Sequence, residues 1–161
     1  MKELLLFRHA KSSWESLVDD RNRGLTEKGI ERTKDMAVVS SKIINDFEVF
    51  FSSPANRAIH TASILIHELQ IPSELLQIRE ALYTFEIYQL LSFIKSIPDH
   101  YSKVICVGHN PAMTNAVNQL STAYLDHLPT AAWALIKFEQ RKWRNVQNGK
   151  TSLGLPKEIL K

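Results

Sequence analysis

The chain of 161 residues is long enough for one domain with a single hydrophobic core. Hydrophobic residues make up 44% of the chain, which excludes a largely disordered protein, and the net charge of +3 is too small to indicate nucleic-acid binding. Cys106 is the only cysteine, so no disulfide can form within the chain. No apolar run is long enough for a signal peptide or a membrane span. We therefore expect a cytoplasmic protein that binds neither membrane nor nucleic acid.

The first predicted element is a buried strand over residues 4–7, four apolar residues followed at once by Arg8 and His9. Ligands of open α/β sheets bind beyond the carboxyl ends of the parallel strands, where this arginine and histidine would lie. Taken alone, such a pair is more often an ordinary strand end than part of a site. A functional interpretation therefore depends on what else reaches the same edge of the sheet.

Strands and helices alternate along the rest of the chain. Thr26 is a good N-cap for a helix that continues to about residue 43, and Pro54 separates a buried strand at 49–53 from a helix that ends near residue 69. The remaining predicted elements are a short strand at 75–78, a helix at 86–96, a buried strand at 103–107, a helix capped by Asn110 with Pro111 at its first position, and closing strands at 132–138 and 143–146. This order predicts an α/β fold, a single domain over residues 1–161 with a mostly parallel central sheet flanked by helices.

Three of the predicted strands lead into residues that bind anions. The first strand is followed by Arg8 and His9, the second by Arg57 in the first turn of the next helix, and the strand at 103–107 by His109. Parallel strands would bring these ends to one edge of the sheet, where two guanidiniums and two imidazoles could hold an anion. A phosphate monoester carries nearly two negative charges at neutral pH, and arginine can bind it bidentately.

Three motifs stand between a predicted strand and the helix that follows it: Arg8-His9-Ala10, Ser52-Ser53-Pro54 with Arg57-Ala58 and Thr61-Ala62, and Gly108-His109-Asn110-Pro111. Together they resemble the histidine phosphatase superfamily, whose fold is also called phosphoglycerate-mutase-like. Further segments look most similar to its small SixA-type phosphohistidine phosphatases: residues 8–14, Arg23 with Leu25-Thr26 and Gly29, and residues 128–131. The resemblance covers nearly the whole chain.

The resemblance implies that His9 is the nucleophile that becomes phosphorylated, and that Arg8, Arg57 and His109 hold the phosphoryl group. These roles agree with the chemistry, because phosphoryl transfer mainly requires positioning and stabilisation of charge on the equatorial oxygens. His9 must present an unprotonated ring nitrogen, with its other N–H held by a backbone carbonyl. The sequence has no cluster of residues with metal-ligand spacing, so we expect no metal and no cofactor.

Further site residues follow from the resemblance. Arg23 matches an additional arginine of the phosphate site, and Ser12 is expected in the same pocket. Gly24 stands where the family usually has proline, which could loosen the loop that carries Arg23. Glu80 is the candidate general acid because it precedes Ala81 at a position like that of the family's acidic residue. A surface glutamate would fit that position equally well, and a phosphohistidine substrate needs less acid catalysis because its P–N bond is labile.

The sequence therefore predicts a metal-independent phosphatase that forms a phosphohistidine intermediate. The expected substrate is a phosphohistidine-bearing protein, such as a member of a phosphorelay. A small-molecule phosphomonoesterase of the same fold is the first alternative, but it would need a lid, and only residues 70–79 separate the second helix from Glu80. The second alternative is an inactive phosphate-binding module, which the intact Arg8, His9, Arg57 and His109 argue against.

Overall fold

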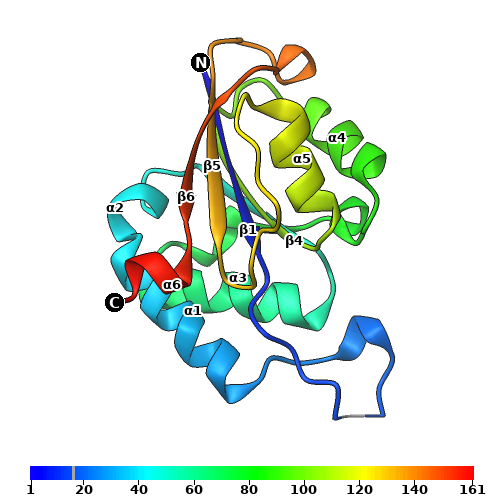
Figure 1. The fold of residues 1–161 in the computed structure, drawn as a ribbon, viewed down its shortest axis with the longest axis vertical. Helices are drawn as coiled ribbons and strands as arrows, with labels where there is room; N and C mark the ends of the chain where they lie inside the picture. The colour runs from blue at the N-terminus through cyan, green and yellow to red at the C-terminus, as the bar shows by residue number, and fades with distance from the viewer. Residues whose placement is uncertain (16) are drawn as a thin grey trace.

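The computed structural model describes residues 1–15 and 17–161, and its centre is one six-stranded sheet (Figure 1). In sheet order the strands are β3 (Leu76–Ile78), β2 (Val49–Ser52), β4 (Lys103–Gly108), β1 (Lys2–Arg8), β5 (Trp133–Phe138) and β6 (Lys150–Gly154). The first four strands in this order are parallel, whereas β5 runs antiparallel to both of its neighbours. The predicted α/β fold with a mostly parallel sheet is confirmed.

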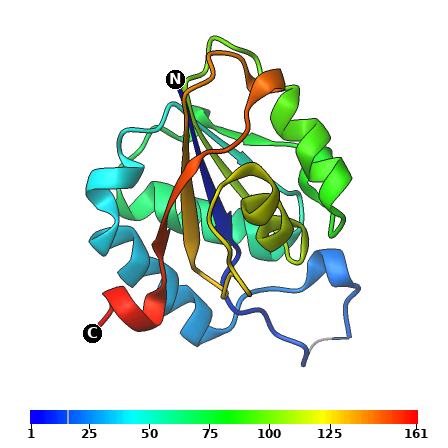
Figure 2. The ribbon, with the colours of Figure 1, turned by 45° about the horizontal axis from the view of Figure 1, so that its top comes forward.

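Helices cover both faces of the sheet (Figures 1 and 2). One face carries α1 (Glu27–Val39), α2 (Ser41–Ile44), α3 (Asn56–Glu68) and α6 (Pro156–Ile159), and the other carries α4 (Ile87–Lys95) and α5 (Ala112–Leu120). Side chains alternate between the two faces along each strand. In β1, Leu4 and Leu6 therefore pack in the core beside α4 and α5, whereas Leu5 and Phe7 pack in the core beside α1 and α3. This two-sided burial explains why β1 is a continuous apolar run.

Local sequence signals place several helix ends where the sequence predicts them. The Thr26 hydroxyl accepts a hydrogen bond from the Gly29 amide at 3.0 Å and begins α1. The Asn110 side chain accepts from the Thr114 amide at 3.1 Å at the start of α5. Pro111, however, precedes the first residue of α5 instead of occupying it. The predicted helix to residue 43 is also too long, because α1 ends before Ser40 and a separate short helix follows.

The predicted closing strand at residues 143–146 is wrong. Trp143–Asn145 form a 3₁₀ turn, and Trp143 is fully buried with its indole N–H donating to the Tyr101 carbonyl at 2.8 Å. In the part of the chain that the structure describes, the last strand is β6, which lies at the edge of the sheet and pairs with β5. An edge strand is partly exposed, so its sequence lacks the apolar run by which the buried strands are recognised.

Candidate active site

The carboxyl ends of three parallel strands lie side by side at one edge of the sheet. Arg8 is opposite Gly108 in the register of β1 and β4, and the His9 amide extends that ladder by donating to the Gly108 carbonyl at 3.2 Å. The Ser53 amide likewise continues from β2 by donating to the Val107 carbonyl at 3.0 Å. The polar residues that follow the strands are thereby brought together, beside the first turn of α3.

The His9 ring is held in one orientation by its neighbours. Its Nδ1 lies 2.7 Å from the Ala10 carbonyl oxygen, so this nitrogen carries the proton, and its Nε2 accepts a hydrogen bond from Arg57 Nε at 3.3 Å. The Ala10 amide is fixed in turn by donating to the Thr61 hydroxyl at 3.0 Å. Burial, together with the positive charges of Arg57 and Arg8, outweighs the bond to Ala10 and lowers the pKa of His9 to about 4. The imidazole is therefore neutral at pH 7, with its lone pair on Nε2.

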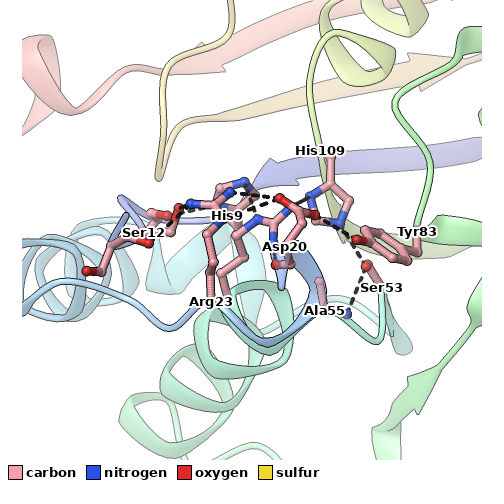
Figure 3. Close-up of polar contacts among 11 residues, drawn as sticks. His9, Ser12, Asp20, Arg23, Ser53, Ala55, Tyr83 and His109 are labelled. Carbon is pink, nitrogen blue, oxygen red and sulfur yellow. Dashed lines mark hydrogen bonds and ion pairs between the residues drawn. The ribbon is translucent and has the colours of Figure 1, made fainter. Parts of the chain in front are cut away.

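His109 packs against His9, with 5.2 Å between the ring centroids. Its Nε2 lies 2.8 Å from the Ser53 hydroxyl, and its Nδ1 lies 3.4 Å from Arg57 Nη2. Burial lowers the pKa of His109 to about 3, with a further contribution from the positive charge of Arg57. The neutral imidazoles of His9 and His109 thus lie next to each other (Figure 3). The Arg57 guanidinium contacts both of them.

Arg8 is held by the loop that precedes β5. Its Nη1 lies 3.1 Å from His127 Nε2 and donates to the Leu128 carbonyl at 3.0 Å. In the described part of the chain, its buried Nε–H has no hydrogen-bond partner, which is the state expected of a donor that binds an anion. This role of His127 could not be predicted from the sequence, because an Asp-His pair in a polar loop gives no signal of the contact with Arg8.

Arg23 and Ser12 lie next to this cluster, and their role in a phosphate site stays a prediction. Arg23 is buried, and its Nη1 donates to the Ser12 hydroxyl at 2.6 Å. The exposed Trp14 ring covers the guanidinium, with its centroid 3.5 Å from Cζ. The other nitrogens of Arg23 face Asp20, which connects this arginine to the rest of the cluster.

Asp20 lies at the centre of the cluster, although no sequence motif indicates it as a site residue (Figure 3). Its Oδ1 accepts from Arg23 Nε at 3.3 Å and Nη2 at 3.2 Å, and its Oδ2 accepts from Arg57 Nη2 at 3.0 Å and the Tyr83 hydroxyl at 2.7 Å. Burial raises the pKa of Asp20, but the hydrogen bonds from Tyr83 and Arg57 outweigh it and lower the pKa to about 2. Asp20 is therefore ionised across the whole physiological range.

Glu80 lies beside the cluster and contacts Arg21. The two side chains form a bidentate ion pair, with Nη1–Oε1 and Nη2–Oε2 distances of 2.6 and 2.9 Å. The Glu80 side chain is 70% exposed, and the hydrogen bond from Arg21 lowers its pKa. Both features oppose proton donation by Glu80 in this conformation, and its role as general acid stays a prediction.

Residues 1–15 and 17–161 contain no group of three or more histidine, cysteine, aspartate or glutamate side chains that could hold a metal ion. No helix in the same part of the chain has the length and apolar character needed to cross a membrane.

Comparisons with known proteins identify the family and the fold. A family model described as histidine phosphatase superfamily (branch 1) matches residues 4–83, which include Arg8, His9 and Arg57. The solved structure of the protein histidine phosphatase SixA complexed with tungstate shares 20% identity, with 99% of each chain covered and a TM-score of 0.83. No curated protein matches the sequence.

Two further solved structures are those of proposed phosphohistidine phosphatases SixA. The protein from Nakamurella multipartitia shares 21% identity over 96% of this chain and 94% of that chain, with a TM-score of 0.79. The protein from Agrobacterium tumefaciens shares 22% identity over 96% of this chain and 99% of that chain, with a TM-score of 0.78. At these identities the structural likeness bears on the fold, and the family model adds the sequence evidence. The chain belongs to the histidine phosphatase superfamily.

Proposed function

We propose that this phosphatase removes the phosphoryl group from phosphohistidine on a partner protein, through a covalent intermediate on His9 and without a metal. The observation that carries the proposal is the state of His9, a buried and neutral imidazole whose Nδ1 proton is held by the Ala10 carbonyl. Its Nε2 faces the guanidinium of Arg57, close to His109. An oriented, unprotonated nitrogen beside donors for an anion is the arrangement that nucleophilic phosphoryl transfer requires.

The reaction would proceed in two displacements. In the first, His9 Nε2 attacks phosphorus, the bond from phosphorus to the substrate imidazole breaks, and the departing nitrogen takes a proton from water. In the second, a water molecule attacks the phosphorylated His9, which releases inorganic phosphate and restores the neutral imidazole. Arg8, Arg57 and His109 would stabilise the charge on the equatorial oxygens in both steps, and Arg23 would contribute from the rim of the pocket.

The open surroundings of the site support a protein substrate. Residues 70–79 contain only a 3₁₀ turn and the short strand β3, so this connection adds no helical lid over the pocket. The aromatic side chains of Trp14 and Phe85 border the site and are 77% and 46% exposed, the first on Arg23 and the second 5.3 Å from His109 between ring centroids. Exposed aromatic residues around a polar site are typical of a surface that docks another protein.

The nucleophile is tested by trapping the phosphoenzyme. Wild-type protein incubated with a labelled phosphohistidine protein in the presence of EDTA should acquire a label that is acid-labile and alkali-stable. His9→Ala should lose both the label and turnover, whereas His60→Ala, which replaces an exposed histidine on α3, should keep both. A label that maps to serine, or near-normal activity of His9→Ala, would contradict the mechanism.

The substrate class is tested by comparing kcat/KM for a phosphohistidine protein with values for phosphosugars and phosphoserine peptides. The protein substrate should be preferred, because small phosphates gain little binding energy from a shallow rim. A small metabolite that exceeds the phosphohistidine protein by about tenfold, a difference of about 1.4 kcal/mol in transition-state binding, would assign the protein to the small-molecule phosphatases instead.

A further inference from the structure

The side chain of Asp20 binds two of the arginines that the proposed function assigns to the substrate's phosphoryl group, Arg57 and Arg23. We propose that Asp20 is an internal competitor: its carboxylate occupies Arg57 and Arg23 in the free enzyme and leaves them when a phosphoryl group binds. The inference rests on the proposed function, because it assumes that these guanidiniums bind a phosphoryl group. It adds a residue that sets the affinity and selectivity of the pocket.

The carboxylate is coordinated as a bound oxyanion would be. Each of its oxygens accepts two hydrogen bonds, Oδ1 from Nε and Nη2 of Arg23, and Oδ2 from Arg57 Nη2 and the Tyr83 hydroxyl. Two guanidiniums and a phenol are groups that recognise phosphates in proteins. Asp20 therefore shares Arg57 and Arg23 with the expected phosphoryl group.

Arg57 has little capacity left for a ligand while Asp20 is bound. Its Nη1 donates to the Asp20 backbone carbonyl at 2.6 Å, its Nη2 contacts both Asp20 Oδ2 and His109 Nδ1, and its Nε donates to His9. A phosphoryl group next to His9 Nε2 needs the same N–H groups. It can obtain them only if Asp20 moves.

The two partners differ in their freedom to move. The Arg57 side chain is 1% exposed and is held between the two histidines, whereas the Asp20 side chain is 39% exposed and belongs to a 3₁₀ turn on the surface. Asp20 can therefore rotate into water without disturbing the core. Neighbouring contacts keep the turn close, since Arg21 pairs with Glu80 and the Asn56 side chain donates to the Asn22 carbonyl at 3.2 Å.

The replacement of the Asp20 carboxylate by a ligand would favour anions with two negative charges. A phosphoryl group with two negative charges and three free oxygens can accept more hydrogen bonds from Arg57 and Arg23 than a carboxylate can. It can also accept from Arg8 Nε, which has no hydrogen-bond partner among the described residues. A monoanion would have to displace Asp20 without a gain in charge. Asp20 would thus lower the affinity of the pocket for all anions and would exclude anions that bind the arginines too weakly to displace its carboxylate.

The test measures binding of tungstate by calorimetry, so that it does not depend on turnover. Asp20→Asn should bind tungstate about tenfold tighter than wild type, because hydrogen bonds to a charged group no longer have to be broken. Asp19→Asn is the matched control, since it removes the same charge from an adjacent exposed residue, and its affinity should stay within about twofold. Equal or weaker binding by Asp20→Asn would mean that Asp20 only positions the arginines, and would overturn the proposal.

A second measurement on wild-type protein avoids any effect of the substitution on folding. The amides of Asn22 and Arg23 donate to the carbonyls of Asp19 and Asp20 at 3.1 and 3.3 Å. Saturating tungstate should speed their hydrogen exchange, because the turn loses the side-chain contacts of Asp20 when the carboxylate rotates into water. Slower or unchanged exchange would overturn the proposal. If neither wild type nor Asp20→Asn bound tungstate, the anion site itself would be wrong, and the proposed function would fail with it. If tungstate binding followed the proposal but phosphohistidine was not hydrolysed, only the proposed function would fail.

Discussion

At the scale of single residues, Arg57 connects the two histidines of the site to Asp20. Its planar guanidinium donates in three directions, to His9, to Asp20 and towards His109. A lysine ammonium could keep the charge but could not span these positions, because it is a compact point charge on a flexible stem. The planar arrangement of the N–H groups, and not the charge alone, should therefore matter for catalysis.

We expect Arg57→Lys to lower kcat by about 10²–10³, the usual loss when a donor to the transition-state charge is removed. Steady-state kinetics on an aryl phosphate measures this effect. Arg32→Lys on the exposed side of α1 is the control and should retain wild-type activity. A fully active Arg57→Lys enzyme would show that charge is sufficient at this position.

At the scale of secondary structure, the start of α1 supports the loop that follows His9. The Lys11 carbonyl accepts from the Thr26 amide at 2.9 Å, and Gly29 packs directly on the Lys11 backbone. A Cβ on Gly29 would lie 2.4 Å from the Lys11 carbonyl oxygen, too close for any contact between non-bonded atoms. The glycine therefore allows the helix to approach the loop, and the loop fixes the backbone next to the nucleophile.

Gly29→Ala should destabilise the protein by about 1–3 kcal/mol, because the Lys11 backbone must shift, even though alanine favours a helix more than glycine does. It should also lower kcat/KM, since residues adjacent to His9 move. Gly24→Ala in the same segment is the control, because its Cβ would meet nothing within 4 Å. Urea unfolding and kinetics of both variants check the prediction, and equal behaviour of the two would contradict it.

At the scale of the whole molecule, the fold buries two neutral histidines at the edge of its sheet. His9 and His109 are 7% and 2% exposed, and their pKa values are lowered to about 4 and about 3. In the unfolded chain both would titrate near about 6.5. Below that pH the unfolded chain binds protons that the folded protein does not, so acidification favours unfolding.

Above about pH 6.5, the two histidines should therefore contribute a constant amount to the free energy of unfolding. As the pH is lowered from about 6.5 to about 5, the free energy of unfolding should fall. Asp20 does not contribute in this window, because the stability that its lowered pKa provides is lost only in stronger acid, as the pH falls towards about 2. Urea unfolding at several pH values measures the slope. His9→Asn should reduce it and His60→Asn should not; an unchanged slope in His9→Asn would contradict the assignment.

The sequence by itself determined the sheet and the pattern of residues at its edge. Buried parallel strands are continuous apolar runs, and the residue after such a run lies at the carboxyl edge whatever the rest of the chain does, so Arg8, His9 and His109 could be placed without coordinates. The structure also brings Arg57 to this edge, from the first turn of α3. Local signals of this kind do not depend on contacts between distant segments.

Only the tertiary structure decided what fills the site and which side chains surround it. Asp20 meets Arg57 across 37 residues and Tyr83 across 63, and His127 meets Arg8 across 119. Such pairs depend on the paths of loops over the surface, which no periodicity encodes. The edge strand β6 was missed for a related reason, because its partly exposed side chains carry no apolar run and its position is set by pairing with β5. Local hydrophobicity in the sequence predicts which strands are buried, whereas contacts between distant loops form only in the folded chain.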